Sequence, residues 1–122
     1  MSAANPENDT VERYRALAGR GPVVMVNLIK FKGPDEQRRC LQGLREIVGP
    51  MLTDLGAETI YAGSAGPEVN MGDDWDVVVL VRYPDFEAFA SLVANPEWVE
   101  KAGALREETI ADSRLVVTHP RS

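Results

Sequence analysis

The chain has 122 residues, a length typical of one domain with a single hydrophobic core. Hydrophobic residues make up 44% and charged residues 26%, as in an ordinary globular protein. The formal net charge of −6 disfavours nucleic acids and anionic membranes as partners, because both carry negative charge themselves. We therefore expect no nucleic-acid partner and no membrane partner.

The single cysteine, Cys40, excludes an intramolecular disulfide framework and fits a reducing cytoplasm, where we expect the protein to be located. Cys40 falls on the apolar stripe of an expected helix, so we interpret it as a core residue and not as a nucleophile. Residues 1–6 lack the basic start and the hydrophobic segment of a signal peptide. One histidine and one cysteine cannot make a standard zinc site within a chain, and we expect neither a metal nor a cofactor.

We divide the chain into an N-terminal tail with a short helix, residues 1–21, and a domain, residues 22–119. Asp9 or Thr10 can cap the short helix, and Gly19 can end it. Residues 22–31 follow as a strand with apolar side chains on both faces, which is typical of a strand covered on both sides.

A long helix is predicted next, from the turn at Gly33-Pro34 to Gly56. From Cys40 onward, its apolar residues recur at three- and four-residue spacing. Pro50 lies inside this pattern, where a proline costs about 3 kcal/mol in a regular helix. The apolar phase is the same on both sides of Pro50, so we expect one continuous, kinked helix.

Two further strands are predicted at residues 58–65 and 75–83, with a loop at 66–74 between them. Asp85 can cap the next helix, and Asn95-Pro96 can start a second helical segment. The last strand is predicted at 114–119. This order predicts an α+β, ferredoxin-like βαββαβ fold, in which both helical connections lie on one face of a four-stranded antiparallel sheet.

The other face of that sheet is predicted to be apolar as well, because the first and third strands carry apolar side chains on both faces. A buried Val, Leu or Ile side chain stabilises a protein by about 1.5–3 kcal/mol, and soluble monomers seldom expose several of them together. We therefore predict a homodimer in which the sheets of two copies pair about a twofold axis.

Several segments resemble the domain-of-unknown-function 1330 family. They are Val26-Asn27-Leu28-Ile29-Lys30-Phe31, Ile60-Tyr61-Ala62-Gly63, the strand from Trp75 to Pro84, and Asn95-Pro96-Glu97-Trp98 with Arg106. The resemblance covers roughly Pro22 to Thr118 and leaves the N-terminal helix outside it. It implies the dimeric α/β-barrel superfamily, in which two sheets pair to enclose a cavity. That superfamily includes cofactor-free oxygenases, isomerases, haem-handling proteins and members with no known activity, so the resemblance implies an architecture and leaves the activity open.

Strand alternation predicts which side chains face the cavity between the two sheets. On the third strand it directs Val77, Val79 and Val81 to the helices, and on the first strand Val24, Val26 and Leu28. The side chains left for the cavity include Met25, Asn27, Ile29, Tyr61, Asp76, Val78, Leu80 and Arg82. We therefore predict a mostly apolar pocket in which the polar side chains are Asn27, Tyr61, Asp76 and Arg82.

Each of these four side chains has a functional interpretation. Arg82 would bind a carboxylate or an enolate-like oxygen. Tyr61 and Asn27 would donate hydrogen bonds to a developing oxyanion. Asp76 would act as a base if burial raised its pKa. The structural alternative is an Asp76–Arg82 or cross-subunit ion pair, with Asn27 bonded to backbone groups.

Two functions stay open at this point. The first is the binding of a small organic molecule between the sheets, in a protein that is a cofactor-independent oxygenase- or isomerase-type enzyme. The alternative is a non-catalytic dimeric module that binds a ligand or has a structural role.

Overall fold

The computed structural model describes residue 5 and residues 8–19, 21–65 and 74–121. In chain order the elements are α1 (Asn8–Ala18), β1 (Val23–Phe31), α2 (Pro34–Asp54), β2 (Glu58–Ser64), β3 (Val77–Tyr83), α3 (Phe86–Ala94), the π-helical turn η2 (Trp98–Gly103), α4 (Ala104–Thr109) and β4 (Ile110–Thr118). Within these ranges, no helix combines the length and the apolar character needed to cross a membrane.

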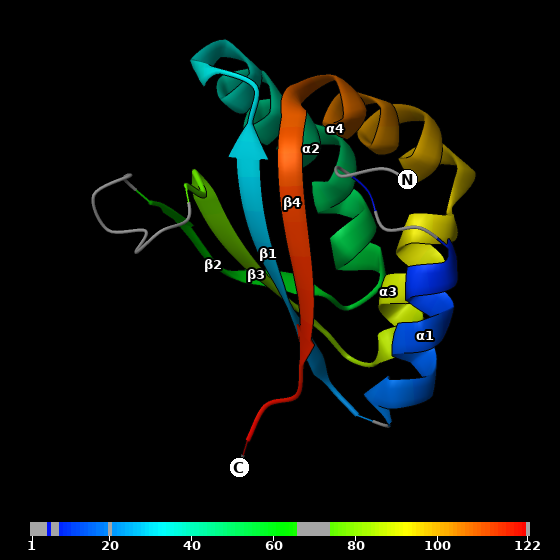
Figure 1. Ribbon diagram of the computed structural model, residues 1–122. Coiled ribbons are helices and arrows are strands. Elements are labelled where there is room, and N and C mark those ends of the chain that lie inside the picture. Colours follow the sequence, from blue (N-terminus) through cyan, green and yellow to red (C-terminus); the bar gives the residue numbers. More distant parts are fainter. Residues whose placement is uncertain (1–4, 6–7, 20, 66–73, 122) are drawn as a thin grey trace.

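The four strands form one antiparallel sheet in the order β2-β3-β1-β4. Figure 1 shows α1, α2, α3 and α4 together on one side of this sheet. The order and the one-sided helical layer confirm the predicted ferredoxin-like α+β fold, with a short helix added at the N-terminus. The predicted loop at 66–74 lies outside the described residues except for Asp74.

The strand boundaries differ most at β4, which begins at Ile110, four residues before the predicted start. This first part of β4 includes the polar residues Asp112 and Ser113, which carry no strand signal of their own. Asp112 pairs with Lys30 and Ser113 pairs with Ile29, both on β1. Backbone pairing with this central strand therefore makes these two residues part of β4. β3 begins at Val77, two residues later than predicted.

The α2 helix is continuous through Pro50, as its apolar pattern predicts. Pro34 occupies its first turn, where a missing backbone N–H costs nothing. Gly56 follows the helix with φ of 71°, a left-handed conformation that favours glycine.

The second helical connection contains three segments. Asp85 caps α3 by accepting a hydrogen bond from the Ala88 N–H at 2.8 Å, as predicted. The chain then forms the π-helical turn η2, whose first residue, Trp98, is 8% exposed, and Ala102 within it is completely buried. Such wide turns are rare in proteins and are frequent at functional sites.

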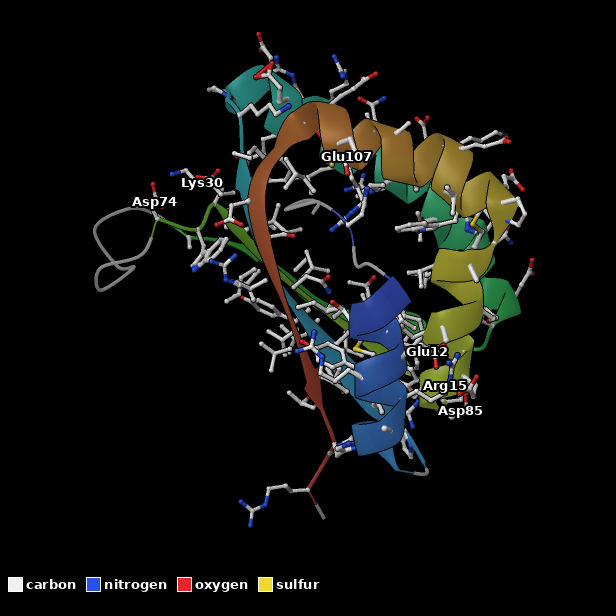
Figure 2. All side chains as sticks on the ribbon, turned by 45° about the vertical axis from the view of Figure 1, so that its right-hand side comes forward. Glu12, Arg15, Lys30, Asp74, Asp85 and Glu107 are labelled. Atoms are coloured by element: carbon white, nitrogen blue, oxygen red, sulfur yellow. The ribbon has the colours of Figure 1, made fainter. Side chains whose placement is uncertain are left out.

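The α1 helix bridges the outer helices and the edge of the sheet. The Arg15 Nε–H donates to Glu87 of α3 at 2.7 Å, and Arg15 also pairs with Glu12 one turn away. Figure 2 shows these two α1 side chains close to Asp85 at the start of α3. On the other side of α1, the Tyr14 hydroxyl donates to the Leu115 carbonyl of β4 at 3.0 Å. The helix therefore covers the space between α3 and β4.

Two apolar clusters lie between the sheet and the helices. The larger cluster includes Met25 and the aromatic side chains Tyr83 and Phe89, whose rings meet edge to face with centroids 5.5 Å apart. The smaller cluster includes Ile29 and Cys40. Asn27 lies on β1 between Met25 and Ile29, and therefore between the two clusters.

Candidate functional site

A cavity of about 940 Å³ lies between the sheet and its helical layer. All four strands contribute to its lining, together with α1, α2, α3, η2 and α4. Three consecutive residues of the edge strand β2 and four of the edge strand β4 line it, which indicates that it extends across the whole width of the sheet.

The walls of the cavity are mainly apolar and aromatic. The sheet contributes three alternate valines of β3, and α2 contributes leucines spaced along its inner face. These residues are Val77, Val79, Val81, Leu41, Leu44 and Leu52. Four aromatic side chains complete the walls: Tyr14, Tyr83, Phe89 and Trp98. Such a surface favours a ligand with a flat or rounded apolar body.

Arg106 of α4 is the polar group of most interest in this lining. Desolvation by burial lowers its pKa, and the neighbouring carboxylate of Glu107 acts in the opposite direction. An arginine keeps its charge at neutral pH even when its pKa is lowered, since the guanidinium group is among the strongest bases in proteins. The cavity thus contains a permanently charged guanidinium group.

The contact between Arg106 and Asn5 brings the N-terminal segment to the cavity. The Arg106 Nε–H donates to the Asn5 side-chain oxygen at 2.9 Å, and the Asn5 amide donates to the Gly103 carbonyl at 3.0 Å. The same amide contacts the Glu107 carboxylate at 3.4 Å. Figure 2 shows Glu107 on α4, at the end of the molecule opposite Arg15. Asn5 therefore connects the N-terminal segment to the last turn of η2 and to α4.

Tyr83 and Cys40 are both held in their neutral forms. Burial raises the pKa of the Tyr83 phenol, and burial also raises the pKa of the Cys40 thiol. The side chains are 4% and 0% exposed, respectively. Tyr83 is therefore a hydrogen-bond donor at neutral pH, and Cys40 is an inert core residue, as its place in the sequence predicts.

Asn27 is the one predicted site residue among the described residues that line this cavity. Its side-chain amide donates to the Val79 carbonyl at 3.2 Å and contacts the Met25 carbonyl at 3.4 Å, which agrees with the structural alternative for this residue. Both of these contacts use the side-chain nitrogen of Asn27. The side-chain oxygen is the part of the amide that can accept a hydrogen bond from a ligand.

The predicted division of β1 between the two faces is wrong. Met25 and Ile29 are 1% and 3% exposed and belong to the clusters beneath the helices, so Asn27 faces the helices with them. Val24, Val26 and Leu28 face the open side instead. Apolar residues occupy both faces of β1, so strand alternation alone does not determine which face meets the helices.

The other three predicted site residues lie away from this cavity. Register pairs Tyr61 with Leu80 and Arg82 with Glu58, which places all four on the open face of the sheet. Tyr61 is 55% exposed, and its ring lies over Gly63, where a Cβ atom would approach the Tyr61 hydroxyl oxygen to 2.2 Å. The four predicted residues therefore do not gather in one pocket within a single copy.

Asp76 has a structural contact. Its carboxylate accepts a hydrogen bond from the Phe31 N–H at 2.8 Å, and its own N–H donates to the Ile29 carbonyl at 2.8 Å. These bonds hold the end of β1 beside the start of β3. No group of His, Cys, Asp and Glu side chains within the described ranges is arranged to hold a metal ion.

The cavity residues that the sequence did not reveal are Arg106, Tyr83 and Asn5. The sequence spacing could have identified Arg106. It lies four residues after Ala102 and eight after Trp98, and both of these residues are buried. A charged residue on such a face needs a partner, so it is a candidate for function. Asn5 gives no such signal, since its role depends on a contact across 101 positions of the chain.

Comparisons with known proteins identify the fold. No family model and no curated protein matches the sequence. A solved protein of unknown function from Rhodopseudomonas palustris matches with a TM-score of 0.80 and 25% identity, over 100% of this chain and 99% of that chain. A dimeric ferredoxin-like protein of unknown function from Jannaschia sp. matches with a TM-score of 0.67 and 13% identity, over 82% of this chain and 100% of that chain.

A third solved structure is a Dabb family protein with a ferredoxin-like fold from Mesorhizobium loti. It matches with a TM-score of 0.63 and 12% identity, over 84% of this chain and 100% of that chain. The chain therefore has a ferredoxin-like fold, and the solved proteins that share this fold include one described as dimeric and of unknown function. The likeness to the domain-of-unknown-function 1330 family stays a prediction.

Proposed function

We propose that the protein binds a small organic molecule in the cavity between its sheet and its helices. The observation that carries this proposal is the cavity itself. Its volume of about 940 Å³ and its apolar and aromatic walls with few polar groups are those of a small-molecule site. This cavity lies on the opposite side of the sheet from the inter-sheet pocket that the sequence predicts, and the inter-sheet pocket stays a prediction.

The chemistry of the lining favours binding over catalysis. Asp112 is the one carboxylate among the described lining residues, and it already pairs with Arg114 at 2.8 Å. A general base needs a free acceptor within reach of the substrate. A second candidate function, cofactor-independent oxygenation or isomerisation, is supported by Tyr83, whose protonated hydroxyl can donate a hydrogen bond to an enolate or oxyanion. The catalytic roles predicted for Tyr61, Asp76 and Arg82 stay predictions.

We also propose that the protein is a homodimer formed through the open face of the sheet. That face carries apolar side chains from three strands: Val24, Val26, Leu28, Val78, Leu80 and Val116. Val116 is 46% exposed, and Tyr61 beside Leu80 is 55% exposed. A second copy would bury these side chains symmetrically, and the Jannaschia relative is described as dimeric.

A neutral fluorescent probe, 1-aminoanthracene, tests the binding proposal. We expect a saturable rise in its fluorescence with the wild-type protein. Val79→Trp and Leu44→Trp, on opposite walls, should each reduce this binding about tenfold or more by filling the cavity. Val99→Trp is the matched control, because Val99 is 52% exposed outside the cavity. Absence of saturable binding, or equal binding by all three variants, would overturn the proposal.

A further inference from the structure

Tyr83 carries a hydroxyl group that makes no hydrogen bond to any residue in the described ranges. The side chain is only 4% exposed, and it lines the cavity between the sheet and the helices. Its ring packs edge to face on Phe89, so the apolar part of the side chain is used in packing. Tyr14, the other described tyrosine of the lining, differs because its hydroxyl donates to the Leu115 carbonyl at 3.0 Å.

The Tyr83 hydroxyl reaches the open space of the cavity. Within the described part of the chain, no side-chain oxygen or nitrogen is both enclosed by protein atoms and unpartnered. The Tyr83 oxygen has no partner, so it is not enclosed, and the space that it reaches is the cavity that the residue lines. Buried donors in proteins are nearly always paired, because an unpaired donor has lost its bond to water without a replacement. A molecule in the cavity would supply the missing acceptor.

The walls around this hydroxyl are apolar. Val81, Phe89 and Leu92 line the same cavity and belong to the same buried cluster as Tyr83. The hydroxyl is protonated at neutral pH, because burial raises the pKa of the phenol. The site therefore offers one uncharged donor on an apolar surface.

A carbonyl oxygen is the acceptor that suits these surroundings. It accepts a hydrogen bond and brings no proton that needs a partner of its own. A ligand hydroxyl would bring a further donor, which is costly to leave unpaired against apolar walls. A carboxylate would bring a charge, which is costlier still to bury. Arg106 also lines the cavity, but its guanidinium group is already hydrogen-bonded to Asn5 at 2.9 Å.

From this arrangement, and resting on the proposed function, we infer that the ligand is an uncharged aromatic or alicyclic carbonyl compound whose carbonyl oxygen accepts a hydrogen bond from the Tyr83 hydroxyl. The ring of the ligand lies against the apolar and aromatic walls of the cavity. Tyr83 is thus the residue that determines specificity for a carbonyl compound over a hydrocarbon of the same shape.

Two probes of nearly equal shape, 2-acetylnaphthalene and 2-isopropenylnaphthalene, test this inference by displacing 1-aminoanthracene. The second probe has a CH2 group in place of the carbonyl oxygen and accepts no comparable hydrogen bond. The quantity compared is the Kd of the alkene divided by the Kd of the ketone, because the difference in hydration between the probes is the same for every variant. We expect Tyr83→Phe to lower this ratio about fivefold, the effect of one neutral hydrogen bond.

Tyr61→Phe is the matched control. Tyr61 pairs with Leu80 on the open face of the sheet, is 55% exposed and is absent from the described lining. We expect Tyr61→Phe to keep the wild-type ratio. A fall in the ratio with Tyr61→Phe as large as with Tyr83→Phe would overturn the assignment of Tyr83.

The remaining outcomes separate this inference from the proposed function. An equal ratio in the wild type and Tyr83→Phe, or failure of 2-acetylnaphthalene to displace bound 1-aminoanthracene, would overturn the inference and leave the proposed function intact. Failure of 1-aminoanthracene itself to bind would overturn both. Tighter binding of 2-naphthoate than of 2-acetylnaphthalene would overturn the assignment of an uncharged ligand.

If Tyr83→Phe does not fold, the infrared carbonyl stretch of 2-acetylnaphthalene bound to the wild-type protein decides. A hydrogen bond from the Tyr83 hydroxyl weakens the carbonyl bond, so we expect the stretch at a lower frequency than in hexane. A frequency equal to that in hexane would overturn the inference.

Discussion

Arg106 of α4 and Asn5 of the N-terminal segment are joined by a hydrogen bond of 2.9 Å, from Nε–H to the amide oxygen, across 101 positions of the chain. This contact fixes the orientation of a charged side chain inside an otherwise apolar cavity. Asn5 is part of the cavity wall, together with Thr10 and Tyr14 of α1. These three residues are therefore components of the proposed site.

The first prediction concerns Asn5. Asn5→Asp would remove the amide that donates to the Gly103 carbonyl at 3.0 Å and would place a carboxylate oxygen against that carbonyl. We expect the free energy of unfolding to fall by about 1–3 kcal/mol, because an acceptor then faces an acceptor. Urea denaturation measures it. The control is Asn95→Asp, which adds the same charge at an exposed helix cap and preserves its acceptor for the Glu97 N–H. Equal losses in the two variants would contradict a local effect.

The second prediction concerns the two glycines at the end of α2. Gly56 has φ of 71°, so Gly56→Ala should lower the free energy of unfolding by about 1–2 kcal/mol. Gly49 lies within the helix without a positive φ, directly before Pro50, and a Cβ atom there would meet no atom within 4 Å apart from its chain neighbours and the helix backbone. The helix propensity gained by Gly49→Ala, about 0.5–1 kcal/mol, is opposed by the Pro50 ring, which crowds the side chain before it, so we expect only a small change in the free energy of unfolding. Urea denaturation measures both, and a loss at Gly49→Ala as large as that at Gly56→Ala would contradict the assigned conformations.

The third prediction is a loss of stability in alkali. Burial raises the pKa of Cys40 above its ordinary value of 9.0 and that of Tyr83 above 10.0. The unfolded chain loses these protons at the ordinary values, whereas the folded chain retains them. Their contribution to stability is complete below pH 9 and is lost as the pH rises, by about 1.4 kcal/mol per pH unit for each group between its unfolded and folded pKa values.

Urea denaturation between pH 7 and pH 11 measures this effect. The control is the double variant Cys40→Ala and Tyr83→Phe, in which the alkaline decline should be much shallower. A decline of unchanged steepness in the double variant would show that other groups cause it.

The fourth prediction concerns the open face of the sheet. Leu80→Lys would place a charge in the centre of the proposed dimer interface, where an unpaired charge is costly to bury. We expect the wild type to sediment as a dimer at micromolar concentration and Leu80→Lys as a folded monomer. Val99→Lys adds the same charge on the exposed surface of η2 and should remain dimeric. A monomeric wild type would contradict the proposal.

The fold could be predicted because the apolar spacing identified each helix and most of each strand. The continuity of α2 through Pro50 and the cap at Asp85 were both predicted from local chemistry and are confirmed. The first residues of β4 could not be predicted in this way. Asp112 and Ser113 become strand through their ladder with β1, which connects segments about 80 positions apart.

The site was much harder to predict, and the reason lies in β1 and α4. Both faces of β1 are apolar, so alternation could not predict whether the Asn27 side chain faces the helices or the open side of the sheet. In α4, the position of Arg106 depends on the wide turn η2, which changes the helical phase between Trp98 and Arg106. The residues that line the cavity come from nearly every helix and strand. No short sequence motif contains enough of them to predict that they lie together.

The most direct test of the proposed ligand site is an NMR titration of the wild-type protein with 1-aminoanthracene, followed through backbone amide shifts. Binding between the sheet and the helices predicts saturable shifts at Asn27, Val79, Trp98 and Arg106, with little change at Val26 and Leu80 on the other face. Saturable shifts concentrated on Val26 and Leu80, or none at any of these amides, would contradict the account.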